Sequence, residues 1–268
     1  MRSVERVKVI SNEQVRPGHF KMRLELPERW GEIRPGQFVH IKIGGSTDPL
    51  LRRPFSFYDV GEGWFEVLYK VVGRGTELLS KAEEGDELDV LGPLGNGFRI
   101  GGSIALALLV GGGVGVASLF LLARKLRERG ISVLALIGAS TSERLLCVDE
   151  LRSLGAEVRV ATEDGSAGFK GTVVELMEEA IGGLKGVKAR IYACGPIGML
   201  EGVCRARKGL PAQLSFESRM ACGLGICLGC VIPTVSGRRY LRVCVDGPVF
   251  EADWIDWEGL RRGFFEGL

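Results

Sequence analysis

Four cysteines near the end of the chain constrain its fold more than any other feature. They are Cys222, Cys227, Cys230 and Cys244. Their spacing, C-x4-C-x2-C-x13-C, is typical of the thiolate ligands of a plant-type [2Fe–2S] cluster. Two irons need four thiolates, and a short loop supplies three of them only where it curls round the cluster. Gly223, Gly225 and Gly229 allow the tight, partly left-handed turns that such a loop needs.

Two other kinds of site remain open for these cysteines. Zinc ribbons favour two separated C-x2-C pairs, and the chain holds one. A disulfide scaffold is usually a shorter secreted chain, whereas three of the seven cysteines here are scattered along 268 residues. The first residues also lack an apolar signal segment, so we expect a cytoplasmic protein. The cluster is the favoured interpretation.

The charges nearly balance, with 35 Lys and Arg residues against 33 Asp and Glu residues and a net charge of +2. Such a surface gives no electrostatic reason to expect a nucleic-acid partner. One uncharged run, residues 104–123, is long enough to span a membrane. Four glycines between residues 111 and 115 divide it into a strand and a helix, which is the pattern of a buried nucleotide-binding unit. We therefore expect no membrane span.

Residues 1–100 have the pattern of short strands separated by turns. β-Branched and aromatic residues are enriched in five segments, 4–10, 20–26, 37–43, 55–59 and 64–71. Pro-Gly and Gly-Gly pairs separate them, and one helical turn is expected at 76–82. Regular spacing of this kind predicts a small antiparallel β-barrel.

Residues 101–210 change to alternating strands and helices. Strands are expected at 104–110, 131–137, 157–161 and 188–193, and helices at 114–129, 145–154, 172–181 and 197–207. This order predicts an α/β domain with a parallel sheet and helices on both faces. In residues 211–268 the helical pattern ends, and we expect a small cluster-binding domain there. The chain is thus expected to have three domains.

An R-R-P-F-S segment in the barrel has the chemistry of a flavin site. The guanidinium groups of Arg52 and Arg53 can each grip a pyrophosphate with two hydrogen bonds. Ser56 could exchange a hydrogen bond with a flavin ring nitrogen, and Phe55 or Tyr58 offers an aromatic face.

Two glycine-rich segments follow, G-R-G-T at 73–76 and G-P-L-G-N-G-F at 92–98. The first places bare backbone N–H groups at a helix N-terminus, where anions bind. Each segment alone is more often a solvated turn. Their occurrence together, ahead of a nucleotide fold, favours a binding site.

Together these motifs resemble the ferredoxin–NADP reductase superfamily. The matching segments are R-P-F-S at 53–56, G-R-G-T at 73–76, the glycine loop at 111–117, C-G-P at 194–196 and the terminal cysteines. More narrowly, G-P-L-G-N-G-F, E-D-G-S-x-G at 163–168 and M-x-C-G-x-G-x-C-x-G-C at 220–230 resemble the electron-transfer subunit of bacterial and archaeal dihydroorotate dehydrogenase. The segments match in order along nearly the whole chain.

The resemblance implies that FAD binds to the barrel. Arg53 would hold its phosphates, Ser56 would face the isoalloxazine, and the ring of Phe55, where the superfamily often has Tyr, would stack on it. Main-chain groups of residues 68–70 would line the flavin, and residues 75 and 76 would cap the pyrophosphate. The implied set is Arg53, Pro54, Phe55, Ser56, Leu68, Tyr69, Lys70, Gly75 and Thr76.

The glycine loop of the second domain fits the dinucleotide fingerprint G-x-G-x-x-G/A poorly in every register. Its small residues still allow close approach to a pyrophosphate, and the expected contacts are Gly111, Gly112, Gly113 and Gly115. No acidic residue follows Ile137, where a ligand of the NAD ribose would be expected. The residues do not choose between NAD and NADP, whereas the family resemblance favours NAD.

Two further segments follow strands at the carboxyl edge of the predicted sheet, where ligands of this fold bind. Asp164 lies in E-D-G-S, which is equally a good turn. The segment Cys194, Gly195 and Pro196 would lie beside the nicotinamide in the superfamily, although a lone cysteine is more often inert core. Cys147 and Cys204 are assigned to packing, and neither His19 nor His40 is taken as a catalyst.

The combined interpretation is an NAD-linked flavin iron–sulfur oxidoreductase subunit without a catalytic acid or base. As the resemblance implies, electrons from dihydroorotate would leave a separate FMN-containing catalytic subunit, cross the cluster, reach FAD and reduce NAD⁺, in pyrimidine biosynthesis. A heterotetramer with two copies of each subunit is expected. One alternative is the diaphorase subunit of a soluble hydrogenase or sulfide-type oxidoreductase. Another is a non-catalytic regulator that holds a structural metal.

Overall fold

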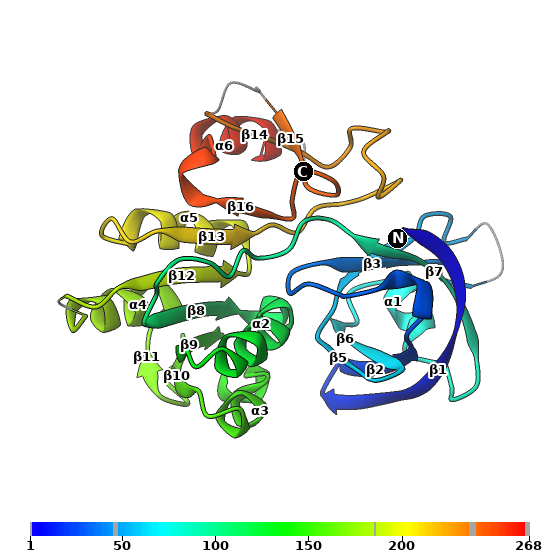
Figure 1. Cartoon of the computed structure of the whole chain (residues 1–268), viewed down its shortest axis with the longest axis horizontal. Helices are drawn as coiled ribbons and strands as arrows, with labels where there is room; N and C mark the ends of the chain where they lie inside the picture. The colour runs from blue at the N-terminus through cyan, green and yellow to red at the C-terminus, as the bar shows by residue number, and fades with distance from the viewer. Residues whose placement is uncertain (1, 45–47, 185, 236–239, 266–268) are drawn as a thin grey trace.

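The computed structural model describes residues 2–44, 48–184, 186–235 and 240–265. An antiparallel barrel, a mainly parallel α/β sheet and a C-terminal segment follow one another along the chain (Figure 1). Among the described residues, no helix combines the length and the apolar character that crossing a membrane requires.

The first sheet has seven antiparallel strands that curl into a barrel, in the order β4-β3-β7-β1-β2-β6-β5. They are β1 (Ser3–Arg16), β2 (His19–Glu25), β3 (Phe38–Ile41), β4 (Arg53–Ser56), β5 (Asp59–Gly61), β6 (Trp64–Lys70) and β7 (Glu87–Leu94). Helix α1 (Arg74–Leu79) lies between β6 and β7. Alternate residues of these strands point inward because successive side chains of a strand face opposite sides. Met22, Phe65 and Val67 are therefore fully buried in the barrel core.

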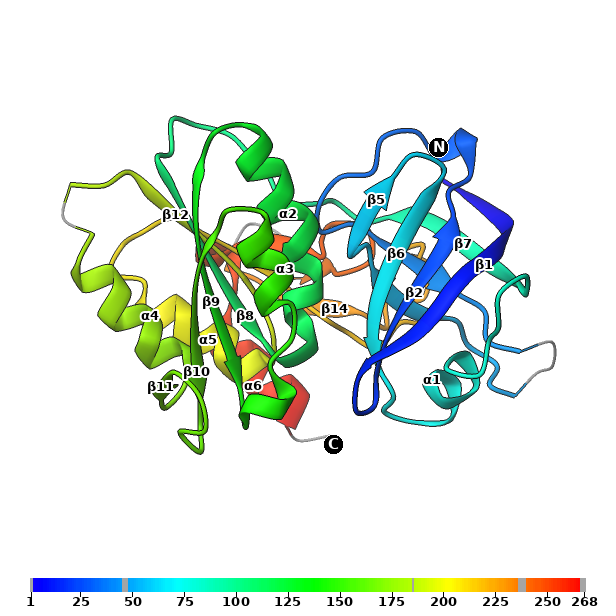
Figure 2. The same ribbon diagram turned by 90° about the horizontal axis from the view of Figure 1, so that it is seen from below.

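The second sheet also has seven strands, in the order β11-β10-β9-β8-β12-β13-β16. They are β8 (Leu106–Gly112), β9 (Ser132–Ala139), β10 (Glu157–Thr162), β11 (Phe169–Lys170), β12 (Ala189–Cys194), β13 (Ala212–Ser215) and β16 (Val249–Glu251). Every pairing is parallel except that of β13 with β16. The helices are α2 (Ala117–Glu128), α3 (Val148–Ser153), α4 (Val173–Gly182) and α5 (Ile197–Ala206). As expected, they cover both faces of the sheet (Figure 2).

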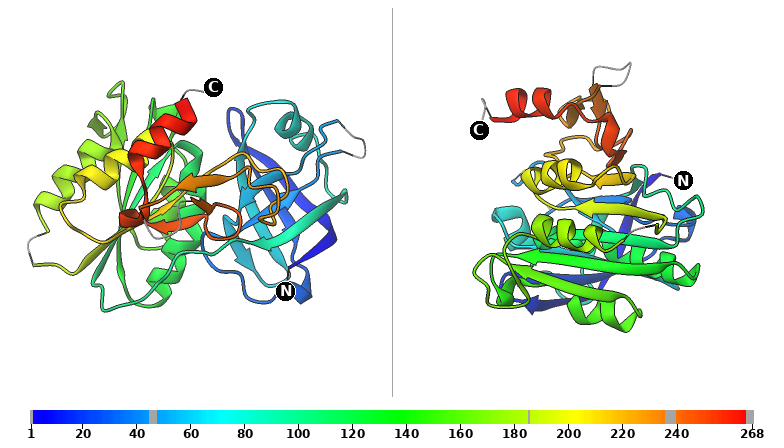
Figure 3. Two further views of the ribbon diagram at one scale, coloured as in Figure 1. Left: turned by 90° about the horizontal axis from the view of Figure 1, so that it is seen from above. Right: turned by 90° about the vertical axis from the view of Figure 1, so that its left-hand side faces the viewer.

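The C-terminal segment holds a two-stranded ribbon of β14 (Val231–Pro233) and β15 (Tyr240–Arg242), followed by α6 (Trp257–Phe265). Short 3-10 turns lie at Glu28–Trp30, Gly113–Val116, Ser142–Arg144 and Ala252–Trp254. The segment stands on the edge of the α/β sheet, and its long loop before β14 lies over the barrel (Figure 3).

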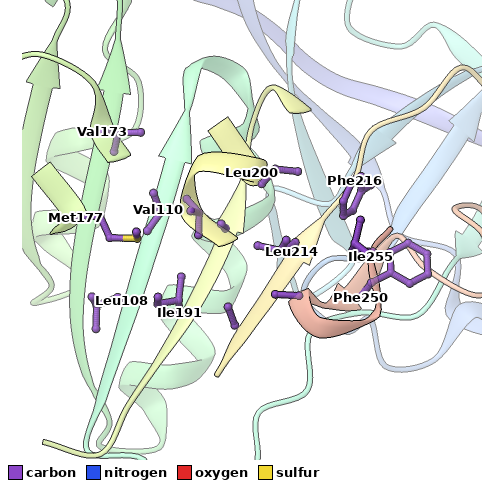
Figure 4. Packing of buried hydrophobic residues seen from close by; sticks show 14 of the residues in the cluster. Leu108, Val110, Val173, Met177, Ile191, Leu200, Leu214, Phe216, Phe250 and Ile255 are labelled. Carbon is purple, nitrogen blue, oxygen red and sulfur yellow. The ribbon is translucent and has the colours of Figure 1, made fainter. Parts of the chain in front are cut away.

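The α/β sheet continues past residue 210, where the sequence predicts a domain boundary. Strand β13 pairs with β12, and β16 returns from the C-terminal segment to pair with β13. The side chain of Gln213 donates to Glu251 at 2.8 Å across this last pair. One hydrophobic core therefore runs from Val110 and Leu214 to Phe250 and Ile255 (Figure 4). The C-terminal segment is anchored in the second domain by this core.

Helix α2 lies between the α/β sheet and the barrel (Figure 2). The rings of Phe120 on α2 and Tyr58 on the barrel stack with centroids 4.5 Å apart and planes 16° apart. Arg124 on the same helix forms an ion pair of 2.8 Å with Asp59. The turn before α2 also contacts β6. Together these contacts hold the carboxyl edge of the α/β sheet close to this barrel strand.

Candidate functional site

The cysteine loop curls through three residues with left-handed backbone conformation. They are Gly223 with φ +67°, Gly225 with φ +78° and Leu228 with φ +58°. The sequence predicts the first two, because glycine adopts positive φ without a steric penalty. The third is a leucine, and Gly229 instead provides space beside the Sγ of Cys227, 3.7 Å from the place that a Cβ would take.

The four thiols lie in two pairs. Cys222 interacts with Cys227, and Cys230 interacts with Cys244. Two pairs suit two irons, because each iron of a [2Fe–2S] cluster takes two thiolates. The paired donors therefore fit a two-iron cluster.

Backbone N–H groups prepare the loop for an anionic cluster. Burial works against the thiolate of Cys222, but N–H groups of Cys227, Leu224 and Ile226 outweigh it and lower the pKa of this thiol to about 6. The N–H of Leu224 lies 3.4 Å from its sulfur. Burial raises the pKa of Cys244 to about 12, and the neighbouring Cys230 adds to the shift. Cluster binding therefore has to displace the proton of Cys244.

The ion pair of Arg242 and Asp246 supports the cysteine loop. Arg242 donates from Nε to Asp246 at 2.9 Å and from Nη2 to the other carboxylate oxygen at 3.1 Å. Its Nη1 donates to the carbonyl of Gly225 at 3.3 Å. A planar guanidinium can make these contacts together. The segment before Cys244 is thus tied to the first turn of the loop.

The loop exposes one thiol and a rim of apolar side chains. Cys230 and Cys244 are buried, whereas Cys227 is exposed. Leu224, Ile226 and Leu228 lie between the first and third cysteines of the loop and are 42%, 78% and 58% exposed. Exposed apolar side chains that gather in this way are typical of a docking surface.

The G-P-L-G-N-G-F segment fastens the barrel to the cysteine loop. The N–H of Asn96 donates to the carbonyl of Gly247 at 2.6 Å. A side chain at Gly95, whose φ is +74°, would lie 2.6 Å from Pro248. Both glycine and asparagine are therefore needed for the contact of barrel and C-terminal segment. The sequence shows this motif but not its partner.

Arg53 and the G-R-G-T turn lie together, as a phosphate site requires. The Nε of Arg53 lies 3.1 Å from the place that a Cβ on Gly75 would take. Among the described residues no carboxylate pairs with this guanidinium, and its Nη1 donates to the carbonyl of Leu51 at 2.5 Å. Arg52 differs, since it is paired with Asp89 at 2.7 Å. Thr76 is buried and accepts from the N–H of Val72 at 2.9 Å, so its hydroxyl orders the turn itself.

The stacking of Phe55 on a flavin stays a prediction. The ring of Phe55 is 8% exposed and lies among the barrel-core residues, edge-on to Tyr69 at 5.6 Å. Tyr69 points inward too. The ring of Tyr58 is buried against Phe120.

The outer face of β4 carries Pro54 and Ser56, since residues alternate along a strand and Phe55 points inward. On β6, Leu68 packs toward the second domain and Lys70 is exposed. Of the flavin contacts expected from the resemblance, Pro54 and Ser56 thus face outward, whereas the rings of Phe55 and Tyr69 face inward. Ser56 remains placed to face a ring system on the outside of the barrel.

The glycine loop after β8 packs tightly against the end of β12. A Cβ on Gly115 would lie 2.7 Å from the carbonyl oxygen of Cys194. A Cβ on Gly112 would lie 2.5 Å from the sulfur of Met199, and one on Gly195 would lie 2.6 Å from its terminal carbon. The structure thus brings the glycine loop and the C-G-P segment together. This packing leaves no space for a side chain at Gly112, Gly115 or Gly195. Gly113 has a left-handed φ of +53°, which also favours glycine.

Cys194 lies at the centre of that edge and is 1% exposed. Burial raises the pKa of its thiol to about 12, and the charge of Glu217 adds to the shift. Glu217 follows β13, and part of its side chain reaches solvent. The protein atoms packed round its carboxyl reduce the hydration of the charged form and so raise the pKa of this group. Sequence reasoning missed Glu217, although its position at the same sheet edge is a signal that could have found it.

Asp164 closes a turn. Its carboxylate accepts from the N–H of Ser166 at 3.0 Å and from the hydroxyl of Ser166 at 2.6 Å. These hydrogen bonds lower the pKa of Asp164. The hydroxyl of Ser166 also accepts from the N–H of Ser142 at 2.8 Å and so joins the loops after β9 and β10. The turn interpretation accounts for all of these contacts.

A hollow of about 350 Å³ lies between the hairpin of β1 and β2 and the segment before α3. It is lined by Tyr58, Cys147 and Glu150, among others, and it shares only Leu68 with the expected flavin contacts. The phosphate site at Arg53 and Gly75 lies outside it. We therefore do not assign the hollow to the cofactor.

Comparison with known proteins agrees with this geometry. The family model described as the iron–sulfur cluster binding domain of dihydroorotate dehydrogenase B matches residues 217–256. The model described as an oxidoreductase NAD-binding domain matches residues 109–205.

Among curated proteins, the electron transfer subunit of dihydroorotate dehydrogenase B (NAD⁺) from Geobacillus thermodenitrificans is 40% identical over 257 residues, 92% of this chain and 96% of that protein. The Bacillus caldolyticus protein of the same name is 43% identical over 226 residues, 82% of this chain and 85% of that protein.

Solved structures show the same fold. The NADH-dependent reduced ferredoxin–NADP oxidoreductase, studied for flavin-based electron bifurcation, aligns with a TM-score of 0.85 and 32% identity, over 97% of this chain and 92% of that one. A ferredoxin–NADP⁺ reductase from Neisseria gonorrhoeae aligns with a TM-score of 0.64 at 17% identity, over 76% of this chain and 90% of that one. The latter likeness concerns the fold alone.

Barrel, α/β domain and cysteine loop together define an NAD-linked flavin iron–sulfur oxidoreductase subunit of the ferredoxin–NADP reductase type. Within that class the relatives narrow the assignment. The chain belongs to the family of electron transfer subunits of dihydroorotate dehydrogenase B.

Proposed function

We propose that the chain passes electrons between an FMN-containing, dihydroorotate-oxidising catalytic subunit and NAD⁺. Its four loop cysteines would hold a [2Fe–2S] cluster, and the outer faces of β4 and β6 would hold FAD. The main support is one spatial relation. The cysteine loop touches β3 at His40, and β3 is hydrogen-bonded to β4, the strand with the R-P-F-S segment. The two proposed redox sites thus share one face of the barrel.

Bound FAD would exchange a hydride with nicotinamide and single electrons with the cluster, which makes it the converter between two-electron and one-electron partners. The residues of the chain bind and orient. Arg53 and the N–H groups near Gly75 would hold the phosphates. Gly115 and Gly195 would let the glycine loop pack against the end of β12 and α5, where the nicotinamide would bind. No side chain needs to act as acid or base, which agrees with the protonated, buried thiol of Cys194.

The catalytic subunit would dock on the apolar rim of Leu224, Ile226 and Leu228. This rim surrounds Cys227, the most exposed of the four ligands, so a partner bound there lies as near to the cluster as the fold allows. A complex with two copies of each subunit is the proposed assembly. Analytical ultracentrifugation of the co-expressed subunits should show this stoichiometry, and Ile226→Glu should weaken the complex while the cluster stays in place.

Anaerobic NADH titration, followed by visible and EPR spectroscopy, tests the proposed electron path. We expect the flavin absorption to bleach and a reduced [2Fe–2S] signal to appear. Cys227→Ser should abolish the EPR signal and retain flavin bleaching. Cys204→Ser, which changes a half-buried cysteine outside the loop, is the matched control. A protein without iron and acid-labile sulfide would contradict the proposal.

Partner identity is tested separately. A catalytic subunit that forms a stable complex and lets dihydroorotate reduce the cluster supports the proposal. Association with a hydrogenase or sulfide-oxidising partner instead would favour a diaphorase role.

A further inference from the structure

His40 is a buried polar side chain with nothing to satisfy it. It is 0% exposed, and neither ring nitrogen makes a hydrogen bond of normal geometry within the described part of the chain. A buried polar group without a partner is costly, so such a group in a native protein calls for an explanation. Its carbonyl, by contrast, accepts from Arg52 at 3.4 Å.

The ring of His40 lies on the face that the two proposed redox sites share. Its neighbours on β3, Val39 and Ile41, point into the barrel core, so His40 points outward. Directly across the strand pair stands Pro54 of the R-P-F-S segment. Opposite residues of an antiparallel pair lie side by side on one face, with Cβ atoms about 5 Å apart. His40 is thus next to the strand that would carry the flavin.

The same ring touches the cysteine loop. A Cβ on Gly223 would lie 2.7 Å from the Nδ1 of His40 and 3.3 Å from Leu94. Gly223 directly follows the ligand Cys222 and has a φ of +67°, so the loop approaches the ring through bare backbone. The loop covers this part of the barrel (Figures 1 and 3). His40 on β3 therefore lies beside the R-P-F-S strand and also contacts the cysteine loop.

Burial, with a smaller effect of nearby cations, sets the protonation state of the ring. Burial, with Arg52 and Arg53 nearby, lowers the pKa of His40 to about 4, while the backbone of Arg52 opposes the shift. At neutral pH the ring is therefore uncharged and has one N–H donor and one acceptor nitrogen. A neutral donor can point at sulfur without adding a buried charge.

We propose that neutral His40 donates its ring N–H to a sulfur of the cluster at the Cys222 end of the loop and thereby raises the cluster's reduction potential. This rests on the proposed function, because it needs the cluster at the four cysteines. A donor on sulfur stabilises the reduced cluster, which carries one more negative charge, and hydrogen bonds to sulfur are among the factors that set such potentials. His40 is a positioning and tuning residue rather than a catalytic one.

The first test is an EPR-monitored redox titration of the complete protein with two variants. His40→Met keeps an unbranched side chain of similar size without a donor, and His40→Gln keeps an N–H donor. We expect the Met variant to shift the cluster potential to more negative values, by about 59 mV if the donor is worth a factor of ten in a one-electron equilibrium. The Gln variant should recover most of the shift. Potentials equal to the parent in both variants would overturn the proposal.

His19→Gln is the matched control, because His19 is the only other histidine of the chain and lies at the start of β2. It should leave the potential unchanged. If the Met variant loses iron and sulfide while the Gln variant keeps them, the donor role is supported.

A second measurement needs no substitution at His40. The chain is labelled with ¹⁵N-histidine, combined with unlabelled partner, and reduced for pulsed EPR. Coupling of a histidine nitrogen to the reduced cluster, retained in His19→Gln, is the expected result. A cluster signal without that coupling overturns the proposal and points to a buried water as the partner of the ring. A parent protein without any cluster signal would instead refute the proposed function, so the two failures are distinct.

Discussion

The side-chain amide of Asn96 donates to the carbonyl of Val245 at 2.8 Å, across 149 residues of sequence. It also reaches the carbonyl of Asp246 at 3.3 Å. Val245 directly follows Cys244, so the last cluster ligand is tied to the loop that ends the barrel. The segment after Cys244 is therefore held to the barrel by the side chain of Asn96.

Asn96→Ala tests the role of this contact. The variant loses two side-chain hydrogen bonds, for which we expect a loss of about 1–2 kcal/mol in the free energy of unfolding. It should also slow electron transfer from reduced flavin to the cluster, measured by anaerobic stopped-flow absorption. Thr172→Ala is the control, because the hydroxyl of Thr172 donates to the carboxylate of Glu175 at 2.8 Å and accepts from its N–H at 3.2 Å at the start of α4, away from the cysteine loop. The control should lose similar stability and keep the parent transfer rate; equal slowing in both would contradict the prediction.

Gly115→Ala should impair reduction by NADH. The added methyl would lie 2.7 Å from the carbonyl oxygen of Cys194, so the glycine loop or the end of β12 must move. Since misplacement of reacting groups by about 1 Å can cost a hundredfold in rate, we expect NADH-driven flavin bleaching to slow by about tenfold to a hundredfold. Flavin and iron content should stay at parent levels.

Gly198→Ala is the control for this substitution. It lies two residues beyond Pro196 on α5, and a Cβ there meets nothing within 4 Å. Parent rates in Gly198→Ala with slow bleaching in Gly115→Ala would support the packing argument. Parent rates in both variants would show that the loop adapts without cost.

Much of this arrangement could be predicted from sequence because it rests on local signals. Glycine runs, Pro-Gly turns and the change from period 2 to strand–helix alternation predict both sheets, and cysteine spacing predicts the loop. The structure also confirms that the uncharged run at residues 104–123 divides into a strand, β8, and the start of a helix, α2.

What the sequence does not predict depends on contacts between distant segments. Strand β16 has three residues, and only its pairing with β13 makes it part of the α/β sheet. The inward face of Phe55 follows from the register of β4 against β3, which a four-residue strand does not reveal. The same holds for His40, because a single histidine in a strand shows no partner in the sequence, whereas in the fold the cysteine loop lies over it.

The ion pair of Arg242 and Asp246 gives a third prediction. Asp246→Asn removes the charge from the paired contact with Arg242, so the turn at Gly225 loses its support. We expect fewer than the parent's ~2 irons per chain and about 1–2 kcal/mol less stability. Asp149→Asn, which breaks an exposed pair with Arg152, should change neither quantity measurably. Full iron content in Asp246→Asn would show that this ion pair is dispensable.

Thiol reactivity gives a prediction in pH for the metal-free protein. N–H donors hold the pKa of Cys222 at about 6 against the opposing effect of burial, so at pH 7 about nine-tenths of this thiol is ionised. Cys194 stays protonated, since burial and Glu217 raise its pKa to about 12. Iodoacetamide should therefore modify Cys222 with a midpoint near pH 6 and spare Cys194, as mass spectrometry of peptides would show. Labelling of both at equal rates at pH 7 would contradict the assignment.

The buried thiols also determine how the free energy of unfolding changes as the pH rises above about 9. Burial raises the pKa of Cys147, Cys194 and Cys244 to about 12, from an ordinary value of 9.0. Between these limits the folded metal-free chain keeps protons that the unfolded chain has lost, so the unfolded state binds fewer protons and stability falls as pH rises. Urea unfolding midpoints should decline steadily from about pH 9 upward. Cys194→Ala should flatten the decline, because it removes one of these retained thiol protons. An unchanged slope in Cys194→Ala would show that this thiol ionises in the fold as easily as in the unfolded chain.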